Sequence, residues 1–447
     1  MTWIQKTVAM LEYYTWTFGP EILGESVPII VILLLGTGLY LTFRLKFLQF
    51  LKLGHGFVVT SGKYDNLSDP GDVSHFQALT TALSATVGIG NIAGVAIAIH
   101  FGGPGALFWM WITALLGMAI KYSEVTLAHH YRSVEKSPSG DLETHGVVSG
   151  GPMYYIERGL GSHWKPLAVF FACSLIFTSF LTGNAIQANT VSDVMFTDLG
   201  IPHWVTGLVT SIIVFLIIVG GIRRIGKVTG FLAPFMAALY VLSAVTILLL
   251  NYEHVFPTLN LICREAFNPA AGVAGTGMGF FLTTMMWGVR RGLFSNESGQ
   301  GSAPIAHAAA KTDEPVSEGV VALLEPFIDT LVICTMTGLV ILITGVWTER
   351  ISTTFNLSSG DISYVTFTEG RRSLKEIAPE AIHVQEGYPI SSDEYPMFAW
   401  HDVPVEEFFL DLECQIKFNG TIYPHRSLAI SDDGYFFTKL YGNGVEN

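Results

Sequence analysis

Long apolar segments alternate with short polar ones over the first three quarters of the chain. A helix needs roughly 20 apolar residues to cross ~30 Å of hydrocarbon. The stretch from 73 to 120 contains no Asp, Glu, Lys or Arg, and it is long enough for two spans turned by GGPG at 102–105. The pattern predicts an all-α polytopic membrane protein with about eight helices, at 27–43, 75–100, 105–128, 166–192, 203–222, 228–251, 272–292 and 316–346.

Basic residues predict how these helices are oriented. Of the 17 Lys and Arg residues before Val346, 14 lie in alternate loops. Such residues accumulate on the cytoplasmic side of a membrane. We therefore expect a multi-pass protein of the plasma membrane, such as a bacterial inner membrane, with its N-terminus outside.

The character of the chain changes at Trp347. The last 101 residues hold 16 acidic and 7 basic side chains. Alternating stretches such as CQIKFNGTIYP predict strands. We expect a transmembrane core over 1–346, and over 347–447 an acidic, water-exposed outer loop or small extracytoplasmic domain that is β-rich or α/β. Cys263 and Cys414 both fall on the predicted outer side, where a disulfide persists if the two residues meet.

Composition narrows the function classes. Half of the residues are hydrophobic and 14% are charged, with a net charge of −13. An acidic chain without a basic patch argues against nucleic-acid binding. The sequence contains no nucleophile elbow, phosphate loop or zinc signature, so we expect neither an enzyme nor a transition-metal site. His129 and His130 are adjacent in the sequence, a spacing that favours solvated side chains over metal ligands.

The sequence SATVGIGN at 84–91 weakens a helix at the centre of an apolar run. Non-helical backbone survives at membrane depth only where it lines a cavity or is buried in protein. Gly88 and Gly90 lower the cost of leaving the helix, and Thr86 and Asn91 add polar side chains at the same level. A binding site is one interpretation. Small residues that only allow close helix packing are the other.

A second span contains glycines in a similar position. The segment TGMGFFLTTMMWGVRRGLFSNESGQGSAP (276–304) has Trp287, Gly288 and Gly292 before a polar exit. Two interrupted helices in corresponding positions are typical of the midplane site of an inverted-repeat transporter. We therefore predict that this helix, like the second, is interrupted.

Four motifs resemble a known family: ATVGIGNIAGVA (85–96), GGPGALFWMWITALLG (102–117), GGPMYYIERGLG (150–161) and GLFSNESGQGSAPIAHAAAKTDEPVSEG (292–319). They closely resemble the alanine or glycine:cation symporters, the sodium:alanine symporter family, from about 28 to about 345. The resemblance implies a leucine-transporter-like inverted-repeat bundle with one extra N-terminal helix. That fold needs eleven spans and this chain supplies eight, so the second repeat is expected to be incomplete and the chain to be a shortened form of a longer protein.

The resemblance also implies roles for individual residues. The ion ligands would be Thr86, Gly88 and Asn91, which with Gly90 would also surround the substrate. Gln187 would contact the amino acid, although an interhelical hydrogen bond is its alternative role. The other wall would be Trp287, Gly288 and Val289, with packing or interfacial anchoring as the alternative for Trp287. The only cofactor implied is Na⁺ as the coupling ion.

Glu325 and Asp329 are four residues apart and share one helix face. Buried acids in a membrane are functional or paired. They are either part of an ion path or a structural set paired with Arg290 or Arg291, and pairing is favoured because transport sites lie nearer the midplane.

The leading hypothesis is Na⁺-driven symport of a small neutral amino acid, alanine or glycine, into the cell. The lack of an acidic residue at the second-helix break favours Na⁺ held by neutral oxygens over a proton relay. The alternatives are a non-transporting amino-acid receptor, a truncated transporter remnant and a channel. The expected partners are the amino acid and the lipid bilayer, and the sequence leaves the oligomeric state open.

Overall fold

The computed structural model describes residues 18–22, 25–66, 68–134, 148–267 and 278–347, and from there 353–357, 362–368, 371–375, 381–390, 397–400, 403–411, 416–423, 426 and 428–444. The chain divides into two compact units. The first comprises Met1–Pro269 and Met278–Thr344, and the second comprises Ala270–Gly277 and Gly345–Asn447. Of the two cysteines on the predicted outer side, which the sequence favours as free thiols over a disulfide, Cys263 is a free thiol and Cys414 lies outside the described residues.

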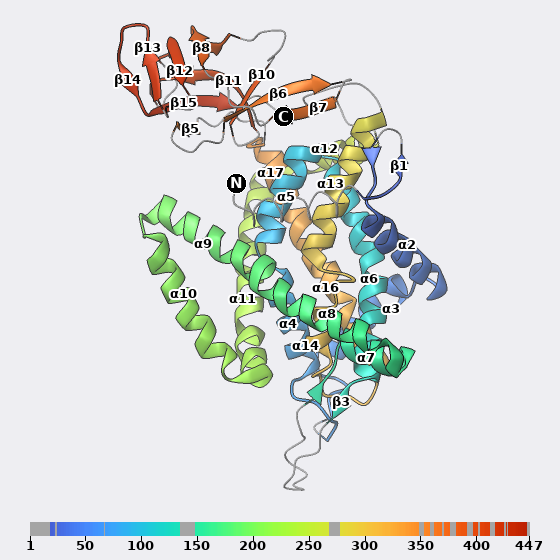
Figure 1. Cartoon of the computed structure of the whole chain (residues 1–447). Coiled ribbons are helices and arrows are strands. Elements are labelled where there is room, and N and C mark those ends of the chain that lie inside the picture. The colour runs from blue at the N-terminus through green and yellow to red at the C-terminus, as the bar shows by residue number, and fades with distance from the viewer. Residues whose placement is uncertain are drawn as a thin grey trace. The chain divides into compact units, whose positions relative to one another are not determined.

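The first unit is helical (Figure 1). Helices occur at each predicted span, and α3, α7, α12 and α14 occupy segments that the sequence predicts as loops. The helices are α2 (Ile29–Arg44), α3 (Leu48–Thr60), α4 (His75–Thr86), α5 (Ile89–Gly102), α6 (Ala106–His130), α7 (Pro152–Leu160), α8 (Lys165–Thr178), α9 (Asn184–Leu199), α10 (His203–Ile218), α11 (Gly221–Leu250), α12 (Tyr252–Glu265), α13 (Met278–Asn296), α14 (Ala303–His307), α15 (Pro315–Ala322), α16 (Leu324–Pro326) and α17 (Thr335–Thr344).

Short elements complete this unit. A 3₁₀ turn, η1 (Ser162–Trp164), precedes α8, and π-helical turns η2 (Ser179–Gly183) and η3 (Phe327–Cys334) precede α9 and α17. Two hairpins are formed by β1 (Glu21–Ile22) with β2 (Glu25–Ser26), and by β3 (Ser133–Val134) with β4 (Val148–Ser149).

Several of these helices are suited to crossing a bilayer. Among the described residues, Ala106–His130, Gly221–Leu250 and Pro315–Thr344 are each long and apolar enough. The pairs α2 with α3 and α4 with α5 also qualify, each bent at a short break, by 81° and 42° respectively. Lys46 and Phe47 make the first bend with φ of 54° and 58°. The chain is a multi-pass membrane protein.

Helix α6 is the buried centre of the unit, in contact with α13, α15, α2 and α14. The glycines of α13 face it. A Cβ atom at Gly288 would lie 2.3 Å from the carbonyl oxygen of Ala106, and one at Gly292 would lie 3.0 Å from Cβ of Thr113. Glycines four residues apart therefore let the two backbones approach closely, as small residues do in membrane helices.

The predicted interruption of α13 at Trp287, Gly288 and Gly292 is wrong. The helix is continuous from Met278 to Asn296. It ends in a turn in which Glu297, Gly299 and Gly301 have positive φ, and α14 follows. The physical reason is the packing against α6, which favours glycine on one face of an intact helix.

The second unit contains two antiparallel sheets. Residues from both sheets, including Phe408, Ile422 and Leu440, pack in one buried core. The six-stranded sheet has the order β5-β15-β11-β10-β6-β7 and the five-stranded sheet β14-β13-β12-β8-β9. The strands are β5 (Thr353–Asn356), β6 (Ile362–Thr368), β7 (Arg371–Lys375), β8 (Ile382–Gln385), β9 (Tyr388–Pro389), β10 (Met397–Trp400), β11 (Val403–Phe409), β12 (Gly420–Tyr423), β13 (Leu428–Ser431), β14 (Phe436–Phe437) and β15 (Lys439–Gly444).

Leucine at Gly117 of α6 should destabilise the bundle. A Cβ atom there would lie 2.6 Å from Oγ of Ser298, whereas nothing lies within 4 Å of the equivalent position at exposed Gly36 of α2. Overpacking of this kind costs about 1–3 kcal/mol. We expect Gly117→Leu to lower the thermal unfolding midpoint of the purified protein and Gly36→Leu to leave it unchanged. Equal midpoints for the two variants would contradict the packing described here.

Candidate functional site

The candidate site is the interruption between α4 and α5, here called the break. Helix α4 ends at Thr86, α5 begins at Ile89, and Val87 and Gly88 between them are extended. The predicted loss of helix at this point is confirmed. Carbonyls at the end of one helix and N–H groups at the start of the next lack intrahelical partners. The break therefore brings together backbone acceptors and donors that lack the regular intrahelical partners.

Asn91 holds the break in place. Its Oδ1 accepts a hydrogen bond from the N–H of Gly88 at 2.8 Å. Its Nδ2 donates to Oδ1 of Asp329 at 2.6 Å and lies 3.1 Å from Oγ of Ser295. One fully buried amide thus connects α5 to α13 and to η3.

Asp329 is completely buried beside the break. Besides Asn91, Ser295 Oγ donates to its Oδ2 at 2.6 Å and Thr330 Oγ1 at 2.8 Å. These donors are neutral. Asp329 lies in the π-helical turn η3, and such turns are frequent at functional sites. The expectation that no acidic group lies at the break is wrong, because tertiary packing brings in a carboxylate from a distant helix.

Gln187 and Phe294 cover the break from two sides. A Cβ atom at Gly88 would lie 3.0 Å from Oε1 of Gln187 on α9, and one at Gly90 would lie 3.4 Å from Cδ1 of Phe294 on α13. The structure therefore brings Gln187 to Gly88, as the resemblance implies. Thr86 is also buried here, with its hydroxyl 3.4 Å from the carbonyl oxygen of Leu83.

Trp287, Gly288 and Val289 lie elsewhere on α13. Trp287 stacks on Phe101 near the far end of α5, with ring centroids 4.6 Å apart. Val289 is buried in a cluster with Val27 and Val31. Trp287 is eight residues before Ser295 and Val289 six, so they lie about 12 Å and about 9 Å further along α13 than the break. The part of α13 beside the break is Phe294 and Ser295, which are not among the predicted site residues.

Glu325 is paired, but not with the expected arginines. Its carboxylate lies 3.0 Å from Nζ of Lys121 and 2.6 Å from Nε2 of His307. The guanidinium groups of Arg290 and Arg291 lie over the ring of Trp287, at 5.7 and 5.6 Å from its centroid. Lys121 lies on α6 and His307 on α14, so tertiary packing and not sequence neighbourhood provides the partners of Glu325.

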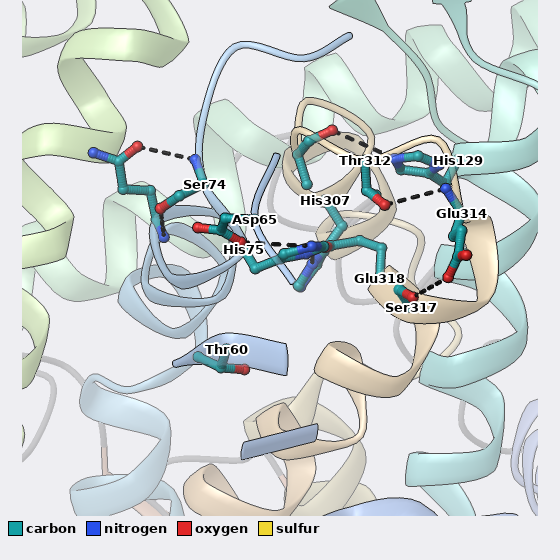
Figure 2. A network of polar contacts seen from close by, with 12 residues as sticks. Thr60, Asp65, Ser74, His75, His129, His307, Thr312, Glu314, Ser317 and Glu318 are labelled. Carbon is teal, nitrogen blue, oxygen red and sulfur yellow. Dashed lines mark hydrogen bonds and ion pairs between the residues drawn. The ribbon is translucent and has the colours of Figure 1, made fainter. Parts of the chain in front are cut away.

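His129 is buried and not solvated as predicted, because α6 extends to His130. Its Nε2 lies 3.4 Å from the carbonyl oxygen of Ala310. His130 is exposed and packs edge-on against Tyr131. Figure 2 shows His129 near a cluster that includes His75, His307 and Glu318. Among the described residues, no group of three or more His, Cys, Asp or Glu side chains is arranged to hold a metal ion.

A polar break within one helix of a multi-pass helical bundle is typical of membrane transport proteins. Comparison with known proteins identifies its family. The sodium:alanine symporter family model matches residues 12–366. The chain belongs to the sodium:alanine symporter family, and its class is a cation-coupled amino-acid symporter, not an enzyme.

Named relatives support the same class. The chain is 48% identical to the sodium/alanine symporter AgcS of Methanococcus maripaludis over 71% of this chain and 68% of that protein. It is 39% identical to the putative sodium/proton-dependent alanine carrier protein YrbD of Bacillus subtilis, over 73% of this chain and 63% of YrbD. It is also 39% identical to the probable sodium/glutamine symporter GlnT of Bacillus subtilis, over 70% of this chain and 62% of GlnT.

Alanine in place of Asn91 should loosen the break. The N–H of Gly88 loses its acceptor and the Asp329 carboxylate loses a donor, and an unsatisfied buried polar group costs about 1–3 kcal/mol. We expect faster amide hydrogen exchange over 84–95 and a lower unfolding midpoint. Asn189→Ala is the matched control, since exposed Asn189 donates only to Asp193 within α9, at 2.9 Å. Unchanged exchange at the break in Asn91→Ala would contradict this role.

Proposed function

We propose that this protein is a Na⁺-coupled symporter that carries a small neutral amino acid, alanine or glycine, into the cell. The single observation that supports the proposal most is the break, at which buried Asn91 joins Gly88 to the buried carboxylate of Asp329. The proposed setting is a leucine-transporter-like bundle over 1–346 in the plasma membrane, with the N-terminus and residues 347–447 outside. A non-transporting receptor is not favoured, because the named relatives are symporters and carriers.

The two helix ends at the break suit the two ends of a zwitterion. The N-terminus of α5 presents N–H groups and positive dipole to the substrate carboxylate. The last carbonyls of α4 accept from its ammonium group, and Gln187 Oε1, next to Gly88, supplies a further acceptor. Unwound carbonyls and half-helix ends hold substrate and ion in this way in other secondary transporters.

The cation is proposed to bind between the break and Asp329. Thr86, Gly88 and Asn91 contribute oxygens, as the resemblance implies. The Asp329 carboxylate lies against Asn91 and adds the negative charge that neutral ligands lack. Its donors among the described residues are neutral, and a buried charge is costly until a cation compensates it. A cation that binds here fixes the arrangement that also binds the substrate, so that each ligand raises the affinity of the other.

Close packing around the glycines favours a small substrate. Gln187 and Phe294 each lie within 3.4 Å of where a Cβ atom would project from Gly88 and Gly90. A substrate side chain that faces these glycines therefore has little space. AgcS and YrbD are named for alanine and GlnT for glutamine, so substrate size differs among the relatives, and we propose that this chain takes alanine or glycine.

Uptake of labelled alanine into proteoliposomes tests the coupling. We expect accumulation under an inward Na⁺ gradient and none under an equal K⁺ gradient, because the cation proposed to bind together with the substrate is Na⁺. A pH gradient alone should not drive uptake, and excess glycine but not glutamine should compete. An identical rate without Na⁺ would remove the proposed coupling ion, and accumulation driven by the pH gradient would replace it with a proton.

Two substitutions at Gly90 test the position of the substrate. A Cβ atom fits, because 3.4 Å to Phe294 is an ordinary contact, so Gly90→Ala should fold and keep alanine binding within about tenfold. Gly90→Leu fills the space and should abolish binding. Equilibrium binding of labelled alanine to the purified variants is the measurement. Unchanged affinity in Gly90→Leu would exclude Gly90 from the site.

A further inference from the structure

Five ionisable side chains form a buried chain that neither the break nor the proposed cation site uses. It consists of His75, Glu318, His307, Glu325 and Lys121, and is called the His–Glu–Lys chain below. Each of the five is at most 1% exposed. They come from α4, α15, α14, α16 and α6 in that order, so the chain connects α4 and α6 to three consecutive elements that are far from them in sequence.

Basic and acidic side chains alternate along the His–Glu–Lys chain. Nδ1 of His75 contacts one carboxylate oxygen of Glu318, and Nδ1 of His307 contacts the other. Nε2 of His307 then lies 2.6 Å from Glu325, whose second oxygen lies 3.0 Å from Nζ of Lys121. At the His75 end of the His–Glu–Lys chain, Nε2 of His75 lies 3.9 Å from Asp65, whose side chain is 34% exposed. Figure 2 shows His75 and Glu318 facing each other, with Asp65 beside them.

The position of His307 determines its protonation. Both of its ring nitrogens contact carboxylate oxygens. A neutral imidazole has one donor and one acceptor, whereas the protonated ring has two donors. Only the doubly protonated ring can donate to ionised Glu318 and ionised Glu325 at the same time. A single proton on His307 therefore joins the His75–Glu318 pair to the Glu325–Lys121 pair.

The mechanical consequence concerns α4. This helix leads directly into the break, and its first residue, His75, is held by Glu318. Glu318 is itself held by His307, which contacts α16 and, through Glu325, the buried α6. Without the bridge, His75 keeps its contact with Glu318 on the continuous α15–α16 helix, but α14 is no longer held to this helix by charge, and no positive charge lies between Glu318 and Glu325.

We propose that doubly protonated His307 is a positioning residue that holds α14 to the α15–α16 helix, keeps in place these two elements that pack on α4, and thereby holds the break in its binding geometry. The proposal rests on the proposed function for its transport readout. It predicts that substrate affinity depends on the protonation of a residue that does not contact the substrate.

The surroundings of His307 determine the sign of the pH dependence. Burial lowers the pKa of His307, but Glu325 and Glu318 outweigh it and raise the value to about 9. A pKa raised above its ordinary value of 6.5 means that the contribution is fully present below pH 6.5 and is lost as the pH rises through about 9. Charged and titratable groups from several elements face the cluster around His307. Helix α4 contributes His75, and α15 and α16 contribute Glu318 and Glu325. The others are Lys121, Glu124 and His129 from α6, Arg132 after α6, and Glu297 after α13.

The test compares His307→Gln with His130→Gln in the full-length protein reconstituted in liposomes. Glutamine is neutral and leaves the His75–Glu318 and Glu325–Lys121 pairs in place, so we expect the variant to fold. At pH 7 the KM for Na⁺-driven alanine uptake should rise about tenfold with a maximal rate within about twofold of wild type, as expected for a change in coupling between sites. Exposed His130 at the end of α6 should tolerate the same substitution without effect.

The pH profile separates positioning from simple loss of structure. Between about pH 8 and about pH 10, with KM expressed as the concentration of zwitterionic alanine, the wild-type KM should rise as His307 loses its proton, whereas the KM of His307→Gln should stay constant. Wild-type KM that is flat over this range would overturn the proposal. So would a His307→Gln variant with wild-type KM. If His307→Gln does not fold, the wild-type profile alone decides.

Hydrogen exchange provides a readout that does not depend on transport. In detergent at pH 7, amides of 75–86 should exchange faster in His307→Gln than in wild type, with those of 203–218 in α10 unchanged. If the wild type shows no Na⁺-driven uptake, the proposed function fails, and this comparison still tests the positioning role. Equal exchange over 75–86 in the two proteins would overturn the proposal.

Discussion

The hydrogen bonds of one amide, Asn91, allow a membrane helix to be interrupted at its centre. Free backbone groups in hydrocarbon are costly, and here Asn91 accepts from the Gly88 N–H while it donates to Asp329. The interruption is therefore stabilised by Asn91 together with side chains from η3 and α13. The same groups that make the break possible surround the space proposed for substrate and ion, so stability and binding depend on one small polar cluster.

Helix α6 packs against α5, α13 and η3, the three elements that form this cluster. Glycines on α13 allow close approach to α6, and Lys121 provides a buried cation deep in the bundle. Glu318, Glu325 and Asp329 lie 7 and 4 residues apart, so they share one face of the α15–η3 helix. That face meets His307 and Lys121 at one end and Asn91 and Ser295 at the other. A buried charge costs several kcal/mol unless it is paired, which makes the arrangement of these elements highly specific.

Much of the candidate site could be predicted from local sequence. Gly88, Gly90 and Asn91 together indicate a weak point in an apolar helix, and the structure confirms it. The spacing of Glu325 and Asp329 correctly placed both on one face, but their partners lie on helices far away in sequence. The glycines of α13 were misassigned because glycine favours both helix interruption and close helix packing, and only the neighbouring α6 distinguishes the two.

The sequence by itself determined that the chain enters the membrane many times, in which segments the apolar helices lie, and which family it resembles. These properties depend on local composition, because burial of apolar residues in lipid and helix formation both act over about 20 consecutive residues. Tertiary structure alone decided that Asp329 faces Asn91, that His307 bridges Glu318 and Glu325, and that α13 stays intact. Each of these outcomes is set by short-range contacts between residues that only folding brings together.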